Sequence, residues 1–226
     1  GYDQHVEINL ESFDNADRYE IWKKDPGAST FYIDTTTRQL RIQDWTGRTE
    51  NSETFSYFIR ALSVPGDVLA TSDTLTTNVF EMSDDQFLDM VQEYTFRYFW
   101  EYAHPVSGMA RERLGSEDVV AIGGTGFGVM SIVVGVHRGW VTRTEAVNRL
   151  LQLVSFLQFA DRFHGAFPHW MNGRTGEALA FSTFDNGGDL VETAFLIQGL
   201  LTARAYFDQD NPSENVLREV ITSIWE

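Results

Sequence analysis

Three carboxylates are grouped where a flexible turn leads into an apolar stretch of the chain. Asp185, Asp189 and Glu192 are spaced at i, i+4 and i+7, and an Asn-Gly-Gly turn separates the first two. Within a helix this spacing would place all three side chains on one face. Neighbouring negative charges raise one another's pKa, so one carboxyl can stay protonated beside an ionised one at neutral pH. An acid next to a base is what hydrolysis of a glycosidic bond requires.

The same residues are also consistent with a helix cap. In an Asp-x-x-Glu pattern ahead of an apolar run, Asp189 would cap the helix and Glu192 would reach back to the cap. Residues 83–86 and 142–145 have a pattern of the same form. A cap does not require a third acid one turn earlier, and Asp185 therefore favours the catalytic interpretation. The spacing alone leaves both interpretations open.

The composition favours a neutral partner. The 226 residues carry a formal net charge of −16, and 42% of them are hydrophobic. A protein with this negative charge repels nucleic acids and anionic membrane surfaces, so we do not expect either as a partner. A neutral oligo- or polysaccharide is compatible with the charge. The chain has no cysteine, which excludes disulfides and thiolate catalysis. We expect no metal and no cofactor, and we expect a monomer.

One uncharged run needs to be weighed as a membrane span. Residues 119–136 just reach the length of a spanning helix, but the run contains Gly123, Gly124, Gly126 and Gly128. These glycines indicate a loop that leads into a buried helix, so we expect no membrane span. They also fail the dinucleotide-binding fingerprint and lack its βαβ context. Close packing of helices is the more plausible reason for them.

Residues 1–79 have the pattern of β-strands. Apolar residues alternate with polar ones at 6–10, 19–23 and 55–62, and turn signals separate these runs. The pattern predicts a small antiparallel sandwich. Residues 17–22 and 55–61 resemble the central strands of fibronectin type III domains. We therefore assign residues 1–79 to a fibronectin III-like β-sandwich.

Residues 80–226 have the pattern of helices. The periodicity and the cap signals predict helices from residue 83 onward, at 126–137, at 142–163, at 189–207 and from 212 onward. The second and fourth are apolar nearly all round, which predicts burial on every side, whereas the first and third have a polar face. This alternation predicts a mainly α toroid with an inner and an outer ring. Five helices do not close such a ring, so we expect a truncated domain with exposed apolar helix faces.

The connection before the fourth helix contains a hairpin pattern that turns at Asn172 and Gly173. His169 and Trp170 could form a sugar site, because an aromatic face stacks on a pyranose and an imidazole bonds a hydroxyl. Packing of Trp170 and Phe167 against the helices is the alternative. A metal is not expected here, since His164 and His169 would lie on opposite faces of a strand. The candidates for substrate binding are Phe167, His169, Trp170, Arg113 and Phe184.

Four motifs occur in order at residues 121–128, 137–140, 165–170 and 185–195: AIGGTGFG, HRGW, GAFPHW and DNGGDLVETAF. From about Asp84 to the last residue, the chain resembles the bacterial glucoamylase-like domain that includes glycoside hydrolase family 144. The resemblance implies an (α/α)6 barrel, of which this chain would be the N-terminal part. That family contains endo-β-1,2-glucanases, and its members are typically exported to the periplasm or the cell surface, often as lipoproteins.

The resemblance also implies roles for the acidic residues. Asp185, Asp189 and Glu192 would form the acidic cluster at the barrel mouth, and hydrolysis would proceed with inversion. A further essential acid is expected in the part of the barrel beyond this chain. The expected function is hydrolysis of a neutral β-glucan, most of all β-1,2-glucan. The alternatives are a glycan-binding protein without activity, a glycosyltransfer or phosphorolysis enzyme, and a polysaccharide lyase on the same barrel.

Overall fold

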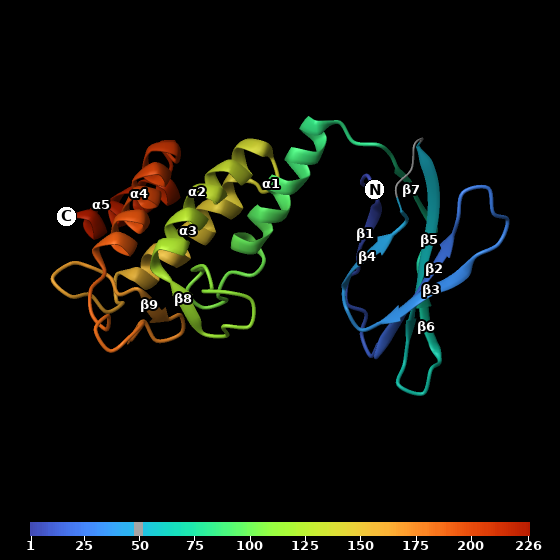
Figure 1. The fold of residues 1–226 in the computed structure, drawn as a ribbon, viewed down its shortest axis with the longest axis horizontal. Coiled ribbons are helices and arrows are strands. Elements are labelled where there is room, and N and C mark those ends of the chain that lie inside the picture. Colours follow the sequence, from blue (N-terminus) through green and yellow to red (C-terminus); the bar gives the residue numbers. More distant parts are fainter. Residues whose placement is uncertain (48–51) are drawn as a thin grey trace. The chain divides into compact units, whose positions relative to one another are not determined.

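The computed structural model describes residues 1–47 and 52–226. Contacts between Cα atoms divide the chain into two units, Gly1–Asp89 and Met90–Glu226, here named the β unit and the helical unit (Figure 1). The chain is 36% helical and 26% strand. The predicted mainly α class is therefore wrong for the chain as a whole, because the β unit and a short sheet in the helical unit add a large share of strand.

The β unit forms two antiparallel sheets from the strands that the structure describes. One sheet pairs β1 (His5–Asn9) with β4 (Arg41–Trp45). The other has the order β3-β2-β5-β6, and β7 also pairs with β5. Its strands are β2 (Arg18–Lys24), β3 (Tyr32–Thr37), β5 (Glu53–Leu62), β6 (Val68–Thr71) and β7 (Leu75–Val79).

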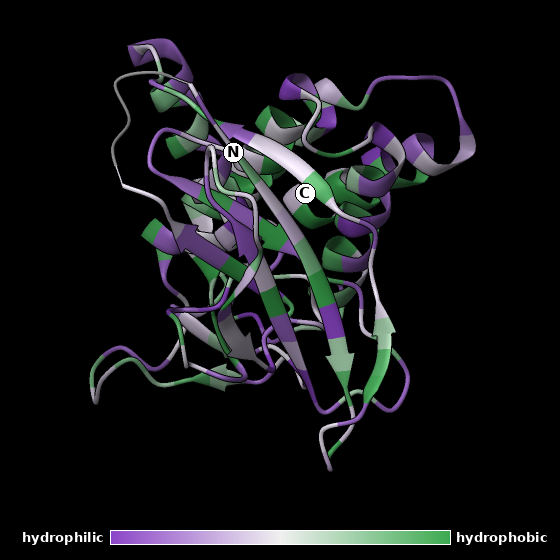
Figure 2. Cartoon of the chain, turned by 90° about the vertical axis from the view of Figure 1, so that its right-hand side faces the viewer, coloured by the Kyte–Doolittle hydropathy of each residue, from purple (hydrophilic) through white to green (hydrophobic). Residues whose placement is uncertain are grey.

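Alternation along the strands builds the core of the β unit. Val6 and Ile8 of β1 are buried against Ile21 of β2 and Tyr57 of β5, so the two sheets pack face to face. Figure 2 shows the matching alternation of hydrophobic and hydrophilic residues along the strands. This arrangement agrees with the predicted antiparallel sandwich. It is compatible with a fibronectin III-like module, which stays a prediction.

Five helices and a three-stranded sheet are described in and beside the helical unit. The helices are α1 (Asp84–Trp100), α2 (Ile122–Arg138), α3 (Arg143–Leu157), α4 (Leu190–Tyr206) and α5 (Pro212–Trp225). The sheet has the order β10-β9-β8, from β8 (Val119–Ala121), β9 (Trp170–Asn172) and β10 (Ala178–Leu179). Strands β9 and β10 form the predicted hairpin.

The predicted cap signals fix several helix starts. Thr142 caps α3 in a capping box, since its hydroxyl accepts from Glu145 N and the Glu145 carboxylate accepts from Thr142 N. Asn211 caps α5, with proline in its first turn. The start of α2 differs from the prediction, because it lies at Ile122 and places the glycines inside the helix rather than in a loop.

Those glycines allow α2 and α4 to touch backbone to backbone. A Cβ atom on Gly126 would lie 2.2 Å from the Phe195 carbonyl oxygen, and one on Gly199 would lie 2.3 Å from the Gly126 carbonyl oxygen. Gly123 of α2 likewise meets Glu192 of α4. The residue numbers of the contacting pairs rise in the same direction along both helices, from Gly123 with Glu192 to Gly126 with Phe195. Helices α2 and α4 therefore run parallel, with their N-termini at one end. The interpretation of the glycines as close-packing residues is confirmed.

We expect Gly126→Ala to destabilise the chain by about 3 kcal/mol, because the added methyl must push α2 away from α4 and strain a packed core. Urea unfolding of residues 1–226 measures this change. Gly124→Ala is the matched control in the same helix, since its Cβ would meet Ala121 Cβ at 3.3 Å and no backbone of α4. The control should change stability by less than about 1 kcal/mol. Equal losses for both variants would contradict the close-packing argument.

Large apolar side chains stay exposed on four of the described helices. They are Phe87, Leu88 and Val91 on α1, Phe127, Met130 and Val134 on α2, Leu190, Val191 and Phe195 on α4, and Val216 and Trp225 on α5. Burial of α2 and α4 on every side, predicted from their composition, is therefore wrong within this chain. Among the described residues, none of the helices combines the length and the apolar character that crossing a bilayer requires.

Candidate active site

The predicted acidic residues lie where two helix N-termini meet. Helices α2 and α4 are parallel, so the segments before them, residues 101–121 and 158–189, gather at the same end of the helical unit. Figure 1 shows β8, β9 and the long loops at this end. An isolated bridge between Pro168 and Gly188 joins the hairpin to the carboxylate turn. Loops held by a rigid scaffold are a common location for binding groups.

Asp189 is the N-cap of α4. Its Oδ1 accepts hydrogen bonds from Val191 N at 2.9 Å and from Glu192 N at 3.0 Å. Its Oδ2 lies 2.9 Å from His169 Nδ1. Because an ionised carboxylate can only accept, Nδ1 of His169 carries a proton, and in the neutral imidazole Nε2 is then an acceptor. The cap interpretation of Asp189 is therefore confirmed, and the same side chain also orients His169.

Asp189 does not behave as the protonated member of an acid pair. Burial alone would raise the pKa of Asp189, but the N–H groups of Glu192 and Val191 and the His169 imidazole outweigh it and lower the pKa below the ordinary aspartate value. The mutual raising of pKa predicted from charge spacing is therefore wrong for this residue. Asp189 is ionised at neutral pH, and protonation of a leaving group has to come from another side chain.

Glu192 points toward the neighbouring helix instead of back to its own cap. Its Oε2 accepts from Gly123 N at 2.7 Å, in the first turn of α2. The reciprocal half of the predicted capping box is wrong, because Asp189 N donates to the Phe167 carbonyl oxygen at 2.7 Å. The N-terminal end of a helix favours a negative group, and α2 has no side-chain cap of its own. Among the described residues, Glu192 Oε1 has no hydrogen-bond partner.

Asp185 lies in the turn before α4 and not on a helix face. Its Oδ2 is 3.7 Å from His169 Nδ1, so Asp185 and Asp189 approach the same imidazole nitrogen. The three carboxylates are thus held by a turn, a cap position and a helix, and the predicted single helix face is wrong. The structure still brings all three to one end of α4.

His169, Asp185 and Asp189 are also the group of described residues that could hold a metal ion. Their ligand atoms lie within 4.8 Å of one another. The contact between His169 Nδ1 and Asp189 Oδ2 is that of a direct hydrogen bond, which already satisfies both atoms. The expectation of a metal-free site stays a prediction.

Aromatic side chains border the carboxylates. The ring of Trp170, the first residue of β9, contacts the Phe181 ring with 4.8 Å between centroids. The Phe181 ring in turn lies 4.1 Å from the His169 ring, centroid to centroid. Phe181 is about half exposed and had not been singled out from the sequence. Phe184 is 99% exposed at the tip of the turn, so its ring is accessible to a ligand.

Two candidates for substrate binding lie elsewhere. Phe167 is fully buried in the core of the helical unit, under the Arg162 guanidinium, so its predicted contact with substrate is wrong. Its backbone N–H donates to Thr193 Oγ1 at 2.8 Å, and this hydrogen bond ties the segment before His169 to the first turn of α4. Arg113 is exposed on the loop before β8 and pairs with Glu112, and no described contact joins it to the carboxylates.

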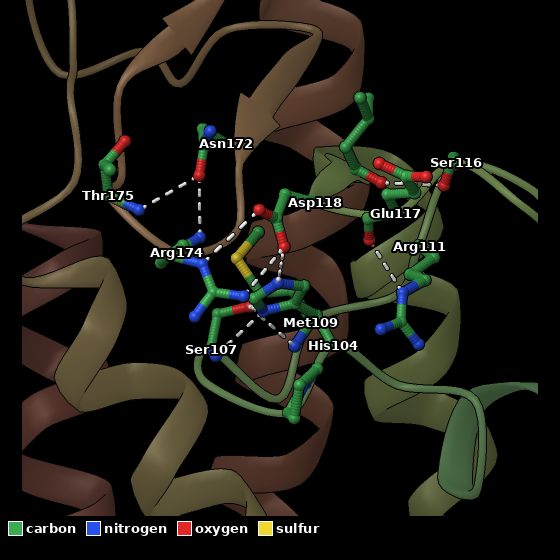
Figure 3. Close-up of polar contacts among 12 residues, drawn as sticks. His104, Ser107, Met109, Arg111, Ser116, Glu117, Asp118, Asn172, Arg174 and Thr175 are labelled. Carbon is green, nitrogen blue, oxygen red and sulfur yellow. Dashed lines mark hydrogen bonds and ion pairs between the residues drawn. The ribbon is translucent and has the colours of Figure 1, made fainter.

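A polar network fixes the hairpin that carries Trp170 (Figure 3). His104 is buried, and its Nε2 lies 3.0 Å from Asp118 Oδ1, which also contacts the Arg174 guanidinium at 3.3 Å. The Asp118 carbonyl oxygen accepts from Gly173 N at 2.7 Å. Hydrogen bonds from His104 and then from Arg174 lower the pKa of Asp118 below its ordinary value. The loop after α1 is thereby tied to the β9–β10 turn.

This network contains the residue types of a hydrolase triad, but it is structural. Ser107 Oγ lies 3.3 Å from His104 Nδ1, yet Ser107 is fully buried and accepts from Met109 N. A nucleophile without access cannot reach a substrate. A separate hollow of about 630 Å³ along α4 and α5 contains none of the predicted site residues.

The comparisons with known proteins point to one class of enzyme. No family model matches the chain. The chain is similar to β-1,2-glucanases, and it spans about a third of the length of the relatives it matches.

Three relatives show this similarity. The exo β-1,2-glucooligosaccharide sophorohydrolase (non-reducing end) of Parabacteroides distasonis is 42% identical over 100% of this chain and 32% of its own length. The crystal structure of a β-1,2-glucanase from the same organism matches with a TM-score of 0.82 at 42% identity, over 99% of this chain and 32% of that one. An endo-β-1,2-glucanase from Chitinophaga pinensis, in complex with sophorotriose and glucose, is 49% identical over 64% of this chain and 36% of that one, with a TM-score of 0.61.

Proposed function

We propose that the chain is part of a glycoside hydrolase that cleaves β-1,2-glucan or its oligosaccharides. The observation that carries the proposal is the 42% identity over the whole chain to a sophorohydrolase. The gathering of Asp185, Asp189 and Glu192 at one end of two parallel helices supports it. The net charge of −16 agrees with a neutral substrate.

The exposed apolar faces support the finer architecture. We propose that α2 and α4 belong to the inner ring of an (α/α)6 barrel, whose remaining helices cover Phe127 and Phe195. The aromatic rings of Phe127 and Phe195 contact each other, with 5.1 Å between their centroids, and both side chains are about half exposed in this chain. Burying them would remove apolar surface from water at a gain of about 25 cal/mol per Å².

The geometry favours different roles for the three acids. Glu192 has one oxygen held by Gly123 N and one free, so we assign it the acid–base contact with the glycosidic bond or the attacking water. Asp189 has both oxygens in use and orients His169, whose Nε2 can accept from a sugar hydroxyl. Asp185 binds a second hydroxyl. Hydrolysis with inversion requires a further acid from another part of the barrel. Export to the periplasm or cell surface belongs to this proposal.

A product screen of the complete protein tests the proposal. We expect sophorose or short β-1,2-glucooligosaccharides to be released from β-1,2-glucan, and no release from β-1,3-, β-1,4- or α-1,4-glucan. Chromatography of the products measures this and separates exo from endo cleavage. Binding of β-1,2-glucan without release of reducing ends would instead identify a glycan-binding protein. A requirement for phosphate would identify phosphorolysis.

A further inference from the structure

A second hollow lies directly beside the carboxylate turn. It has a volume of about 210 Å³, and its walls include Asp161, Phe163, Pro168, Asn186, Gly187 and Gly188. Asn186 to Gly188 are the residues between Asp185 and Asp189, and Pro168 precedes His169. The hollow therefore shares its wall with the proposed catalytic centre. It is smaller than a typical ligand pocket of about 300–1,000 Å³, so it suits one ring rather than a long segment.

The walls offer the groups that recognise a sugar ring. Phe163 is 64% exposed, although a large aromatic side chain gains stability by burial. The Asp161 carboxylate is fixed in the wall, because its Oδ2 accepts from Ala178 N at 3.0 Å. Its Oδ1 has no hydrogen-bond partner among the described residues, and the exposed residue Asn186 also lines the hollow. An aromatic face with a fixed acceptor and an amide suits a pyranose and its hydroxyls.

The wall also contains one cation. The Arg162 guanidinium donates to the Leu157 carbonyl oxygen at 3.1 Å and lies 4.7 Å from the centre of the buried Phe167 ring. The Asp161 carboxylate in the same wall balances this charge and would repel a phosphate or a uronate. The charge arrangement selects a neutral ligand.

We propose that this hollow is a second sugar subsite, which binds the glucosyl unit next to the one held at Asp185, Asp189 and Glu192. The inference rests on the proposed function. In this arrangement Phe163, Asp161 and Asn186 determine which substrate chain lengths the protein prefers. Phe163 stacks on the ring, and the two polar side chains bond its hydroxyls.

Two variants of the complete protein test the subsite. Phe163→Ala removes the stacking face at a position that is 64% exposed, where the ring contacts His164. Gly187→Val adds a side chain to the wall of the hollow, at a position where a Cβ would meet no atom within 4 Å and where φ is not positive. We expect each variant to raise KM about 5- to 10-fold for β-1,2-glucooligosaccharides long enough to reach the hollow, with a smaller effect on sophorotriose. The loss should fall on KM rather than on kcat.

Phe159→Ala is the matched control, since Phe159 is an 88% exposed aromatic in the same loop that does not line the hollow. An unchanged KM in both subsite variants, or an equal change in the control, overturns the subsite. Calorimetric titration of the variants with β-1,2-glucooligosaccharides measures affinity independently of turnover. A wild-type protein that binds these sugars without hydrolysing them would refute the proposed activity, while the affinities of the two variants would still decide the subsite.

Discussion

Glu192→Gln in the complete protein should lower kcat on β-1,2-glucan by about 10³-fold, within the range for loss of a general acid or base. Glutamine has the same shape and can still accept from Gly123 N, the contact that Glu192 makes at 2.7 Å. The substitution therefore preserves the link between α4 and α2 and removes only the ability to ionise. Because binding contacts remain, KM should change far less than kcat.

A neighbouring acid provides the control for this experiment. Glu177 lies on the β9–β10 hairpin and accepts from Thr175 Oγ1 at 3.1 Å, and no described contact joins it to Asp185, Asp189 or Glu192. Glu177→Gln makes the same chemical change and should leave kcat within about twofold. Rates are measured by release of reducing ends under single-substrate conditions. If Glu192→Gln kept wild-type activity, Glu192 would be a structural link between helices and the assignment would fail.

The spacing in the sequence indicated that Asp185, Asp189 and Glu192 lie near one another, but it could not indicate the hydrogen-bond partners of these residues. Asp189 follows a local rule, since an N-cap bonds residues two and three positions further on, and this part was predictable. Glu192 bonds Gly123, 69 residues away, and His169 reaches Asp189 across 20 residues. Such contacts depend on the packing of α2 against α4, which no local pattern specifies.

The pKa of Asp189 shows why spacing alone misled. Charge spacing considers only repulsion among carboxylates, which raises pKa. Two backbone N–H groups and an imidazole act on Asp189 at hydrogen-bond distance, and together they lower its pKa. Burial is the effect that raises the pKa of this carboxyl, and the hydrogen bonds outweigh it. The direction of the shift therefore followed from the helix cap, which the sequence had offered as the competing interpretation.

The fold was predictable where the pattern is local and strong. Strands β1, β2 and β5 follow from alternation, and the starts of α3 and α5 follow from caps. The start of α2 was placed too late, because glycine is a poor helix former and the run around Gly126 reads as a loop. Tertiary packing overrides that preference, since only a glycine fits where the Phe195 carbonyl oxygen approaches.

A buried ion pair holds the start of α3 against the start of α5. The Glu214 carboxylate accepts from Arg143 Nε at 2.9 Å and from the terminal nitrogen of the same guanidinium at 2.8 Å. Gln209 N and the Asn211 amide complete its shell. The Glu214 side chain is 3% exposed. Loss of the Glu214 charge leaves the Arg143 guanidinium, whose side chain is 26% exposed, with the exposed Asp208 carboxylate at 3.5 Å, and costs about 3 kcal/mol.

We expect Glu214→Gln to destabilise residues 1–226 by this amount at pH 7. The hydrogen bonds from Arg143 hold the pKa of Glu214 at about 2, against an ordinary value of 4.5. A lowered folded-state pKa means that this stabilisation is fully present above about pH 4.5. It is lost as the pH falls toward 2, and the loss amounts to about 3 kcal/mol.

Urea unfolding midpoints measured between pH 3 and pH 7 test the linkage. The wild type should lose stability below pH 4.5 more steeply than Glu214→Gln, whose side chain does not titrate. Glu93→Gln is the control, because Glu93, whose side chain is 30% exposed, pairs with Arg97 one helical turn away on α1 and should change stability by less than about 1 kcal/mol. Parallel pH curves for the wild type and Glu214→Gln would show that the pair contributes no pH-dependent stability. A recovery in the double variant Arg143→Met with Glu214→Leu would show that the single variant suffers from the unpaired charge rather than from lost packing.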